Sequence, residues 1–214
     1  MKYQAVVFDL YGTLIEDQLR KGRDALLVQM AAVLSLPADD FAAAWEQTGD
    51  QRTTGGFDTL EECVAHICQA LGARPDAERI EAAVELRVGY IRARLRPRDD
   101  AVETLTRLKS LGRKTALISD CGLEVPMLWS ETLFFSLFDT VLFSSREGRR
   151  KPDPVLYRRA CERLGVEPGG CLYVGDGNSR ELSGAESYDY GALEAGGWRG
   201  ERIGALREIM ELVD

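Results

Sequence analysis

The chain has 214 residues, of which 45% are hydrophobic and 29% are charged, as is usual for a globular protein with a buried core. Its length suits one large domain, or a compact core that carries a smaller inserted subdomain. The formal net charge of -8 argues against nucleic acid as a partner, because an acidic surface repels phosphates.

The sequence contains no apolar run of the roughly 20 residues that a membrane-spanning helix needs. The amino-terminal apolar stretch is short and is interrupted by Asp9, which is typical of a strand and not of a signal peptide. The five cysteines form no CxxC pair, which favours reduced thiols. We therefore expect a cytoplasmic protein with no membrane partner, present as a monomer or homodimer.

The chain begins with a predicted buried strand. Ala5 to Phe8 is a continuous apolar run that ends in Asp9, as expected for a parallel strand covered on both faces. From about residue 18 to residue 96 the apolar residues change to the i, i+3, i+4 spacing of helices. These helices are predicted over about 24–36, 39–49, 59–72 and 78–95, with Asp39 and Thr59 as N-caps and Gly72 as a C-cap.

Strands return beyond Pro97. Short apolar runs at 114–118, 140–144 and 171–174 alternate with helices that end near Gly112, cover about 154–164 and cover about 203–213. Such alternation indicates right-handed βαβ units in one parallel sheet. We predict an α/β fold in which a Rossmann-like parallel sheet core (residues 1–15 and 97–214) carries an inserted α-helical cap subdomain (16–96), with hinges near 16–19 and 96–99.

Reactive or charged side chains follow each predicted strand. In an open parallel sheet, functional groups collect beyond the carboxyl ends of the strands. Any one of these residues could serve only to cap or turn the chain, but their coincidence at four strand ends indicates an active site. The residues are Asp9, Ser119 with Asp120, Lys151 after a basic loop, and Asp176 with Asn178 and, one turn later, Glu181.

Four sequence motifs occur in the order found in a known family. FDLYGTL, ALISD, GRRKPDPVLY and YVGDGNSREL resemble the four motifs of the haloacid dehalogenase-like hydrolase superfamily. The helical stretch after the first motif is similar to the cap of that family. The resemblance covers nearly the whole chain and implies a hydrolase that acts on a small molecule.

The resemblance also implies catalytic roles. Asp9 would attack phosphorus or carbon and form an aspartyl intermediate, which water then hydrolyses. Ser119 would hydrogen-bond a substrate oxygen, and Lys151 would keep Asp9 ionised and offset charge in the transition state. Tyr11 occupies the place of the family's acid/base residue.

A Mg²⁺ site is implied by the same comparison. Its ligands would be Asp9, the backbone carbonyl of Tyr11, and Asp176. Glu181 stands where the family has a further acidic residue, which either joins the metal site or positions Lys151.

Substrate contacts are expected from both parts of the chain. Thr13, Asp120 and Asn178 are expected to bind substrate in the core. In the cap, the stretch 51–57 combines a cation, hydroxyls and flexible glycines, so we expect it to be a specificity element with Arg52 as its charged group.

Tyr11 departs from the phosphatase majority of the family, which has a second aspartate at this place. A tyrosine with a pKa of about 10 is a poor base at neutral pH, and loss of a positioned acid/base group costs roughly 10²- to 10⁴-fold in rate. Tyrosine here resembles the 2-haloacid dehalogenase branch, in which the halide leaves without a proton. Asn178 also fits the dehalogenase pattern.

Asp176 favours the opposite assignment, because dehalogenases of that branch carry serine and asparagine where this chain has Gly175 and Asp176. Several carboxylates beside Lys151 would repel one another without a further cation, and Mg²⁺ suits such oxygen ligands. We therefore predict a Mg²⁺-dependent phosphatase of a small phosphorylated metabolite. The alternatives are a metal-independent 2-haloacid dehalogenase and a catalytically weakened member that binds a ligand or a partner protein.

Overall fold

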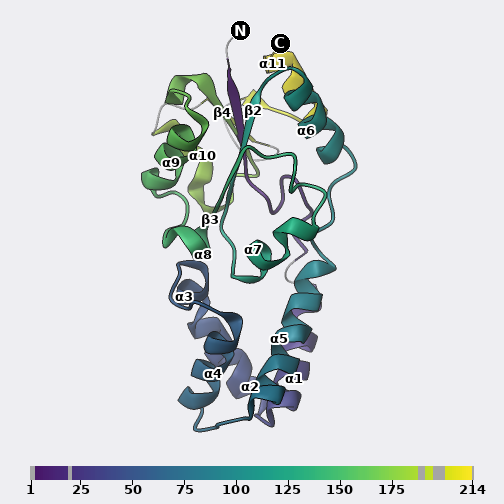
Figure 1. The fold of residues 1–214 in the computed structure, drawn as a ribbon, viewed down its shortest axis with the longest axis vertical. Helices are drawn as coiled ribbons and strands as arrows, with labels where there is room; N and C mark the ends of the chain where they lie inside the picture. Colours follow the sequence, from purple (N-terminus) through teal and green to yellow (C-terminus); the bar gives the residue numbers. More distant parts are fainter. Residues whose placement is uncertain (1–2, 19–20, 188–190, 195–200, 214) are drawn as a thin grey trace.

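The computed structural model describes residues 3–18, 21–187, 191–194 and 201–213. The molecule is elongated, with a parallel sheet and its flanking helices at one end and a body of helices at the other (Figure 1). In the described part of the chain, no single helix is long and apolar enough to cross a membrane. Only α1 (Arg23–Leu34) and α2 (Ala38–Gln47) together reach the required length and composition, and they are bent by 111° at their junction.

The sheet has six parallel strands in the order β3-β2-β1-β4-β5-β6. The first strand along the chain, β1, is central, and Phe8 at its end lies opposite Leu117 on one side and Val174 on the other. The four predicted strands are confirmed, whereas β5 and β6 were not predicted. The strand bounds are β1 Ala5–Phe8, β2 Lys114–Ser119, β3 Thr140–Phe143, β4 Cys171–Gly175, β5 Gly191–Glu194 and β6 Glu201–Arg202.

Helices cover both faces of this sheet. Val6 and Phe8 belong to a core formed with α6 and α11, and Ala5 and Val7 belong to a core formed with α9 and α10. This division follows from the two-residue period of a strand, and it explains why β1 is apolar throughout. The helix bounds in this part are α6 Ala101–Ser110, α7 Glu124–Leu128, η1 Trp129–Glu131, α8 Ser144–Glu147, α9 Pro154–Leu164, η2 Pro168–Gly170, η3 Asn178–Arg180, α10 Glu181–Glu186, η4 Leu206–Ile209 and α11 Met210–Val213.

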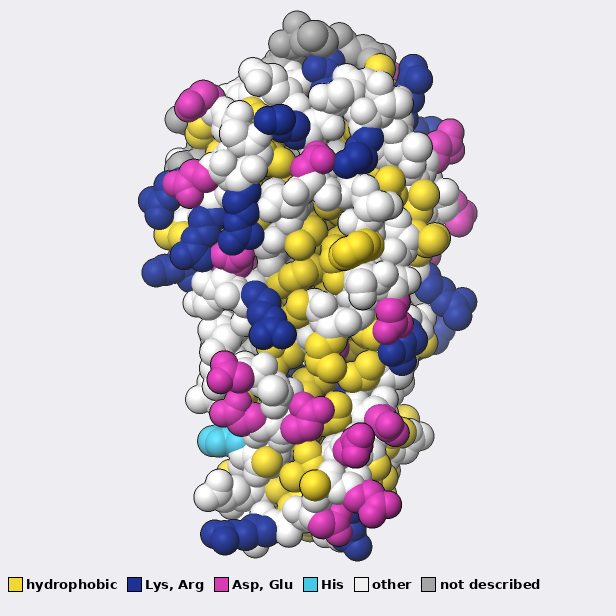
Figure 2. Space-filling view, viewed as in Figure 1, with side chains coloured by type: hydrophobic (Ala, Val, Ile, Leu, Met, Phe, Trp, Pro, Cys, Tyr) yellow, Lys and Arg dark blue, Asp and Glu magenta, His cyan; other side chains and the backbone are white. Residues whose placement is uncertain are grey.

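The helical body has its own apolar core, built around Trp45, Phe41 and Met30, which are 1%, 0% and 0% exposed. On the face seen in Figure 2, acidic side chains gather over this body, and basic side chains cluster over α9. Its helices are α1 Arg23–Leu34, α2 Ala38–Gln47, α3 Gly49–Thr53, α4 Leu60–Ala70 and α5 Ala77–Arg92.

The predicted helix ends are partly right. The Thr59 side chain accepts a hydrogen bond from Glu62 N and caps α4 as predicted. Asp39 as an N-cap was wrong, because Pro37 takes that place and Asp39 lies in the first turn of α2, where a carboxylate suits the helix dipole. The predicted loop 51–57 begins inside α3.

The predicted final helix over 203–213 was also wrong at its start. A 3₁₀ turn forms first, over Leu206–Ile209, and only four residues of α-helix follow it, Met210–Val213. Gly204 and Ala205 precede the turn and offer no side chain that could cap a longer helix.

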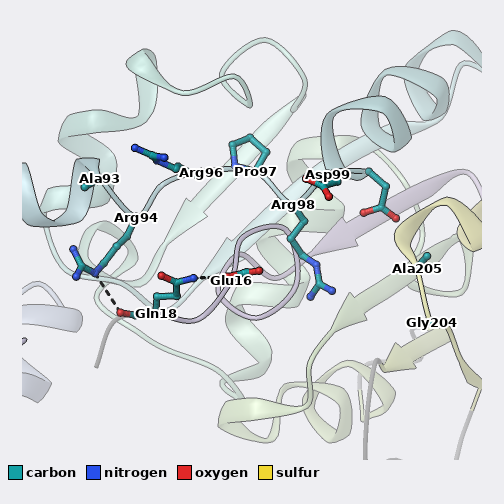
Figure 3. A pocket seen from close by; sticks show the side chains of 11 residues that line it. Glu16, Gln18, Ala93, Arg94, Arg96, Pro97, Arg98, Asp99, Gly204 and Ala205 are labelled. Carbon is teal, nitrogen blue, oxygen red and sulfur yellow. Dashed lines mark hydrogen bonds between the residues drawn. The ribbon is translucent and has the colours of Figure 1, made fainter. Parts of the chain in front are cut away.

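Two chain segments join the helical body to the sheet, beside a pocket of about 350 Å³ (Figure 3). Ile15 forms isolated bridges with Tyr11 and Pro97, and Arg94 donates a hydrogen bond to the Gln18 carbonyl. These segments coincide with the predicted hinges, although Leu19 lies outside the described residues. The division into domains at 16 and 96 stays a prediction. None of the residues that directly follow β1, β2 or β4 lines this pocket, so it does not contain the predicted site residues of these strand ends.

Candidate active site

The carboxyl ends of the central strands meet the helical body at a cleft of about 910 Å³. Asp120, Lys151 and Asn178 line the cleft from the sheet, and Thr53 of α3 lines it from the helical body. The strand-end rule therefore brings residues that are distant in sequence to one surface, opposite the predicted specificity element.

Lys151 is the central cation of this cluster. Its side chain is 3% exposed and donates hydrogen bonds to Asp9 Oδ1 and Glu181 Oε2. Burial alone would lower the pKa of Lys151, but the negative charges of Asp9, Glu181 and Asp120 outweigh that effect and raise the pKa above its ordinary value. Lys151 is therefore a protonated, fixed positive charge beside Asp9.

Asp9 is 4% exposed at the end of β1. Burial raises the pKa of its carboxyl, and the nearby Lys151 ammonium opposes that rise. The ionised carboxylate that a nucleophile requires therefore depends on Lys151.

Glu181 is held by three donors. Oε2 accepts hydrogen bonds from Lys151 and, at 3.0 Å, from the Tyr173 hydroxyl, while Oε1 accepts one from Gly177 N at 3.1 Å. Burial and the negative charge of Asp9 raise the pKa of Glu181 to about 7. These contacts give Glu181 a fixed orientation in which it holds Lys151.

One carboxylate oxygen from each of Asp9, Asp176 and Glu181 lies within 4.8 Å of the other two. Asp176 accepts hydrogen bonds from the backbone N and side-chain Nδ2 of Asn178, at 3.0 and 2.6 Å. Three carboxylates face one ammonium group, and carboxylate oxygens are the ligands of hard cations. The donor set therefore fits a divalent metal ion.

Gly12 makes this arrangement possible. It has φ +83, a backbone conformation that other residues rarely adopt, and a Cβ here would collide with the Asp176 carboxylate. The first motif thus supplies both Asp9 and the space into which Asp176 extends.

Three predicted site residues carry buried oxygens with no hydrogen-bond partner in the described part of the chain: Thr13 Oγ1, Ser119 Oγ and Asp120 Oδ2. Asp120 uses its other oxygen to accept a hydrogen bond from Lys151 N at 3.0 Å. A buried polar atom without a partner costs about 1–3 kcal/mol. Each of these three oxygens therefore lacks the hydrogen bond that usually compensates burial.

Tyr11 lies close to charged groups of α5 and α7, and Arg52 belongs to α3 of the helical body. Burial, followed by the Cys121 thiol and the Glu124 carboxylate, raises the pKa of the Tyr11 phenol well above its ordinary value, so the phenol stays protonated at neutral pH. Arg52 donates hydrogen bonds to the Trp45 carbonyl and Thr48 Oγ1.

Sequence reasoning missed three residues that matter for the geometry. Tyr173 was hidden in the apolar run of β4, where its hydroxyl is the one polar side-chain group of the strand besides the Cys171 thiol. Arg87 and Glu124 form a buried ion pair across the two bodies, and neither residue belongs to a recognisable motif.

The parallel sheet with β1 at its centre, the helices that follow β1 in the chain and the buried Asp9–Lys151 pair define an α/β protein with an aspartate and a lysine at its candidate site. A model of the haloacid dehalogenase-like hydrolase family matches residues 3–189. The chain belongs to this family, and it is a hydrolase.

Curated relatives fall into both chemical branches. An (S)-2-haloacid dehalogenase 4A from Burkholderia cepacia is 30% identical over 203 residues, which cover 89% of this chain and 81% of the relative. A phosphoglycolate phosphatase from Thiobacillus denitrificans is 30% identical over 179 residues, covering 81% and 74%. A glyceraldehyde 3-phosphate phosphatase from Methanopyrus kandleri is 31% identical over 122 residues, covering 56% of this chain and about half (52%) of the relative.

Solved structures share the fold. The crystal structure of a HAD phosphatase from Thermococcus onnurineus superposes with a TM-score of 0.70 at 21% identity, covering 98% of this chain and 97% of that one.

Proposed function

We propose that this hydrolase is a Mg²⁺-dependent phosphatase of a small phosphorylated metabolite, with Asp9 as the nucleophile. The observation that carries the proposal is the cluster of Asp9, Asp176 and Glu181, whose ligand oxygens lie within 4.8 Å of one another. Lys151 is paired with two of these carboxylates, Asp9 and Glu181. Excess carboxylate charge favours binding of a cation, and Asp176 supplies a carboxylate that a metal ion would bind.

In the proposed reaction, an oxygen of Asp9 attacks phosphorus and the bond from phosphorus to the alcohol oxygen breaks. Water then hydrolyses the aspartyl phosphate, which releases inorganic phosphate and restores Asp9. Lys151 keeps Asp9 ionised and offsets charge on the transferring group, while Ser119 and Thr13 donate hydrogen bonds to its oxygens. Asp120, with one unpartnered oxygen, is the candidate acid for the leaving alcohol.

Asp9, the Tyr11 carbonyl and Asp176 would hold the Mg²⁺ ion, with Glu181 fixing Lys151 beside them. The ion supplies charge neutralisation and orients a phosphate oxygen. Family resemblance and the acidic cluster support this assignment, and the phosphatases among the relatives are consistent with it.

The test is hydrolysis of an aryl phosphate with Mg²⁺ and after treatment with EDTA. We expect Mg²⁺-dependent turnover that Asp9→Asn abolishes and Asp176→Asn lowers by about 10² or more, as for loss of a metal ligand or transition-state donor. Activity that persists in EDTA, or in Asp176→Asn, would contradict the proposal.

A second candidate is a metal-independent 2-haloacid dehalogenase, which Tyr11 favours because a halide leaves without a proton. In that reaction Asp9 attacks carbon, halide departs, and water hydrolyses the aspartyl ester. Halide release from 2-chloropropionate in EDTA would support this candidate, and no release from several haloacids would exclude it.

A further inference from the structure

A second group of charged side chains lies between the helical body and the sheet. Arg52 on α3 and Arg87 on α5 both lie over the indole ring of Trp45, with their guanidinium carbons 4.0 and 5.3 Å from the ring centroid. Two cations from different helices thus share one aromatic wall, which restricts their rotamers.

These cations are not equally compensated. Arg87 donates a hydrogen bond to Glu124, whose side chain is 2% exposed. Arg52 donates to the Trp45 carbonyl at 2.8 Å and to Thr48 Oγ1 at 3.3 Å, which are both neutral. No carboxylate in the described ranges of the chain forms an ion pair with Arg52.

The Glu124 carboxylate also acts on Arg52, but it is the hydrogen-bond partner of Arg87 and balances one positive charge of the two. Arg23 acts on Arg52 from α1, but it is paired with Glu46. Burial and then the Arg87 charge lower the pKa of Arg52 to about 10, so it remains protonated at neutral pH. The group therefore carries one uncompensated positive charge, and a partly buried charge of this kind favours binding of an anion.

The group adjoins the candidate active site on two sides. Arg87 and Glu124 both act electrostatically on Tyr11, two residues after the proposed nucleophile. Thr53, which follows Arg52, lines the cleft that contains Lys151. The arginine group is thus one residue away in sequence from a side chain that lines the cleft, and it acts on a residue of the first motif.

We propose that Arg52 and Arg87 bind a carboxylate of the substrate and so select phosphomonoesters that carry an acid group. The proposal rests on the proposed phosphatase function. Guanidinium groups suit a planar carboxylate because they donate two parallel hydrogen bonds. Glu124 neutralises one of the two arginines, so the group has one net positive charge. One positive charge matches a single carboxylate better than a second phosphate dianion.

The experiment compares phosphorylated hydroxy acids of two to four carbons, beginning with phosphoglycolate, with the monophosphates of the matched diols. In the wild type we expect kcat/KM for the best acid to exceed that for its diol by about tenfold or more, the value of one charge-assisted hydrogen bond. Arg52→Gln and Arg87→Gln should each lower this acid-to-diol ratio about tenfold, through a higher KM for the acid.

Two further variants separate recognition from structural support. Glu124→Gln frees Arg87 and should lower the KM for the acid, in the direction opposite to Arg87→Gln. Arg92→Gln is the matched control, because Arg92 also lies on α5 but forms an exposed pair with Glu131. It should leave the acid-to-diol ratio unchanged.

Equal kcat/KM for acids and diols in the wild type would overturn the proposal. The proposal would also be overturned if Arg52→Gln and Arg87→Gln lowered kcat/KM equally for acids and diols, since that result indicates a structural role. If no phosphomonoester is hydrolysed, the proposed function fails. In that case, calorimetry can test the carboxylate subsite separately, by comparing the affinities for phosphoglycolate and 2-hydroxyethyl phosphate. Equal affinities for the two ligands would reject the subsite.

Discussion

Lys151 and Glu181 form an ion pair with side chains only 3% and 0% exposed, next to the candidate nucleophile Asp9. The same ammonium group also holds Asp9. Two buried carboxylates therefore share one cation, and a third carboxylate, Asp176, lies close to both. Without a metal ion, the cluster relieves its repulsion by retaining a proton.

This shared cation predicts how the metal-free protein responds to pH. Burial and Asp9 raise the pKa of Glu181 to about 7, above the ordinary 4.5. The folded state then binds more protons than the unfolded state between these two values, so the free energy of unfolding falls as pH rises from about 4.5 to about 7. We expect thermal unfolding in EDTA to show this fall.

Glu181→Gln should remove that part of the pH dependence, because glutamine does not titrate. Glu131→Gln is the control, since Glu131 is an exposed partner of Arg92. Mg²⁺ should flatten the wild-type profile by replacing the proton. Identical pH profiles for the wild type and Glu181→Gln would contradict the assigned pKa.

Removal of Lys151 should affect both catalysis and stability. We expect Lys151→Met to lower kcat by about 10²–10³, the usual loss for a group that stabilises developing charge. It should also lower the free energy of unfolding by about 3–5 kcal/mol at pH 8, because two buried carboxylates lose their partner. This stability loss should shrink at pH 5, where Glu181 is protonated.

Lys109→Met provides the comparison, because Lys109 pairs with Asp139 at the surface, with side chains 34% and 40% exposed. Urea unfolding and steady-state kinetics measure the two effects. If Lys151→Met lowered kcat and the free energy of unfolding no more than Lys109→Met, the buried ion pair would contribute to neither catalysis nor stability.

Because Gly12 lies against Asp176, we expect that adding one methyl group at position 12 weakens Mg²⁺ binding. A Cβ at position 12 would meet the Asp176 carboxylate, so Gly12→Ala should displace that ligand and raise the Mg²⁺ concentration needed for half-maximal activity by about tenfold. Mg²⁺ titration of activity and of the melting temperature measures the change.

Gly112→Ala separates backbone strain from this steric effect. Gly112 also has a positive φ of 70°, but a Cβ there would meet no heavy atom of the described residues within 4 Å. We expect a stability loss of about 1 kcal/mol from strain and an unchanged Mg²⁺ requirement. A similar Mg²⁺ defect in both variants would reject the steric explanation.

The sequence predicted the central sheet well because buried parallel strands leave an unmistakable pattern. Ala5 to Phe8 is covered on both faces, so all its side chains are apolar. The pattern fails for β5, whose sequence, GALE, contains a glycine and a glutamate and has only four residues. A short strand with so weak a pattern is recognised only by its pairing with β4.

The sequence allowed prediction of those candidate site residues that lie at the carboxyl ends of predicted strands. Asp9, Ser119 and Asp176 stand at positions that the topology brings together. The buried Arg87–Glu124 pair was not predictable, because α5 reads as an ordinary charged helix and the partner lies 37 residues away in sequence. Which charges of a helix are buried is decided by tertiary packing, and periodicity alone does not show it.

Tyr11 sets the last prediction, because a phenol with a raised pKa neither removes nor supplies a proton readily at neutral pH. Tyr11→Asp places a carboxyl two residues after Asp9. We expect it to raise kcat for an alkyl phosphate by about 10²-fold, since an alkoxide needs a proton to leave. An aryl phosphate with a good leaving group should gain far less.

Tyr11→Phe is the matched control, because it removes the hydroxyl without adding an acid. Its ratio of alkyl to aryl phosphate turnover should equal that of the wild type if the phenol transfers no proton. A reduced ratio in Tyr11→Phe would instead show that the tyrosine donates to the leaving group. An unchanged ratio in Tyr11→Asp would mean that the new carboxyl is turned toward Glu124 and Arg87, the charged groups that already surround the phenol.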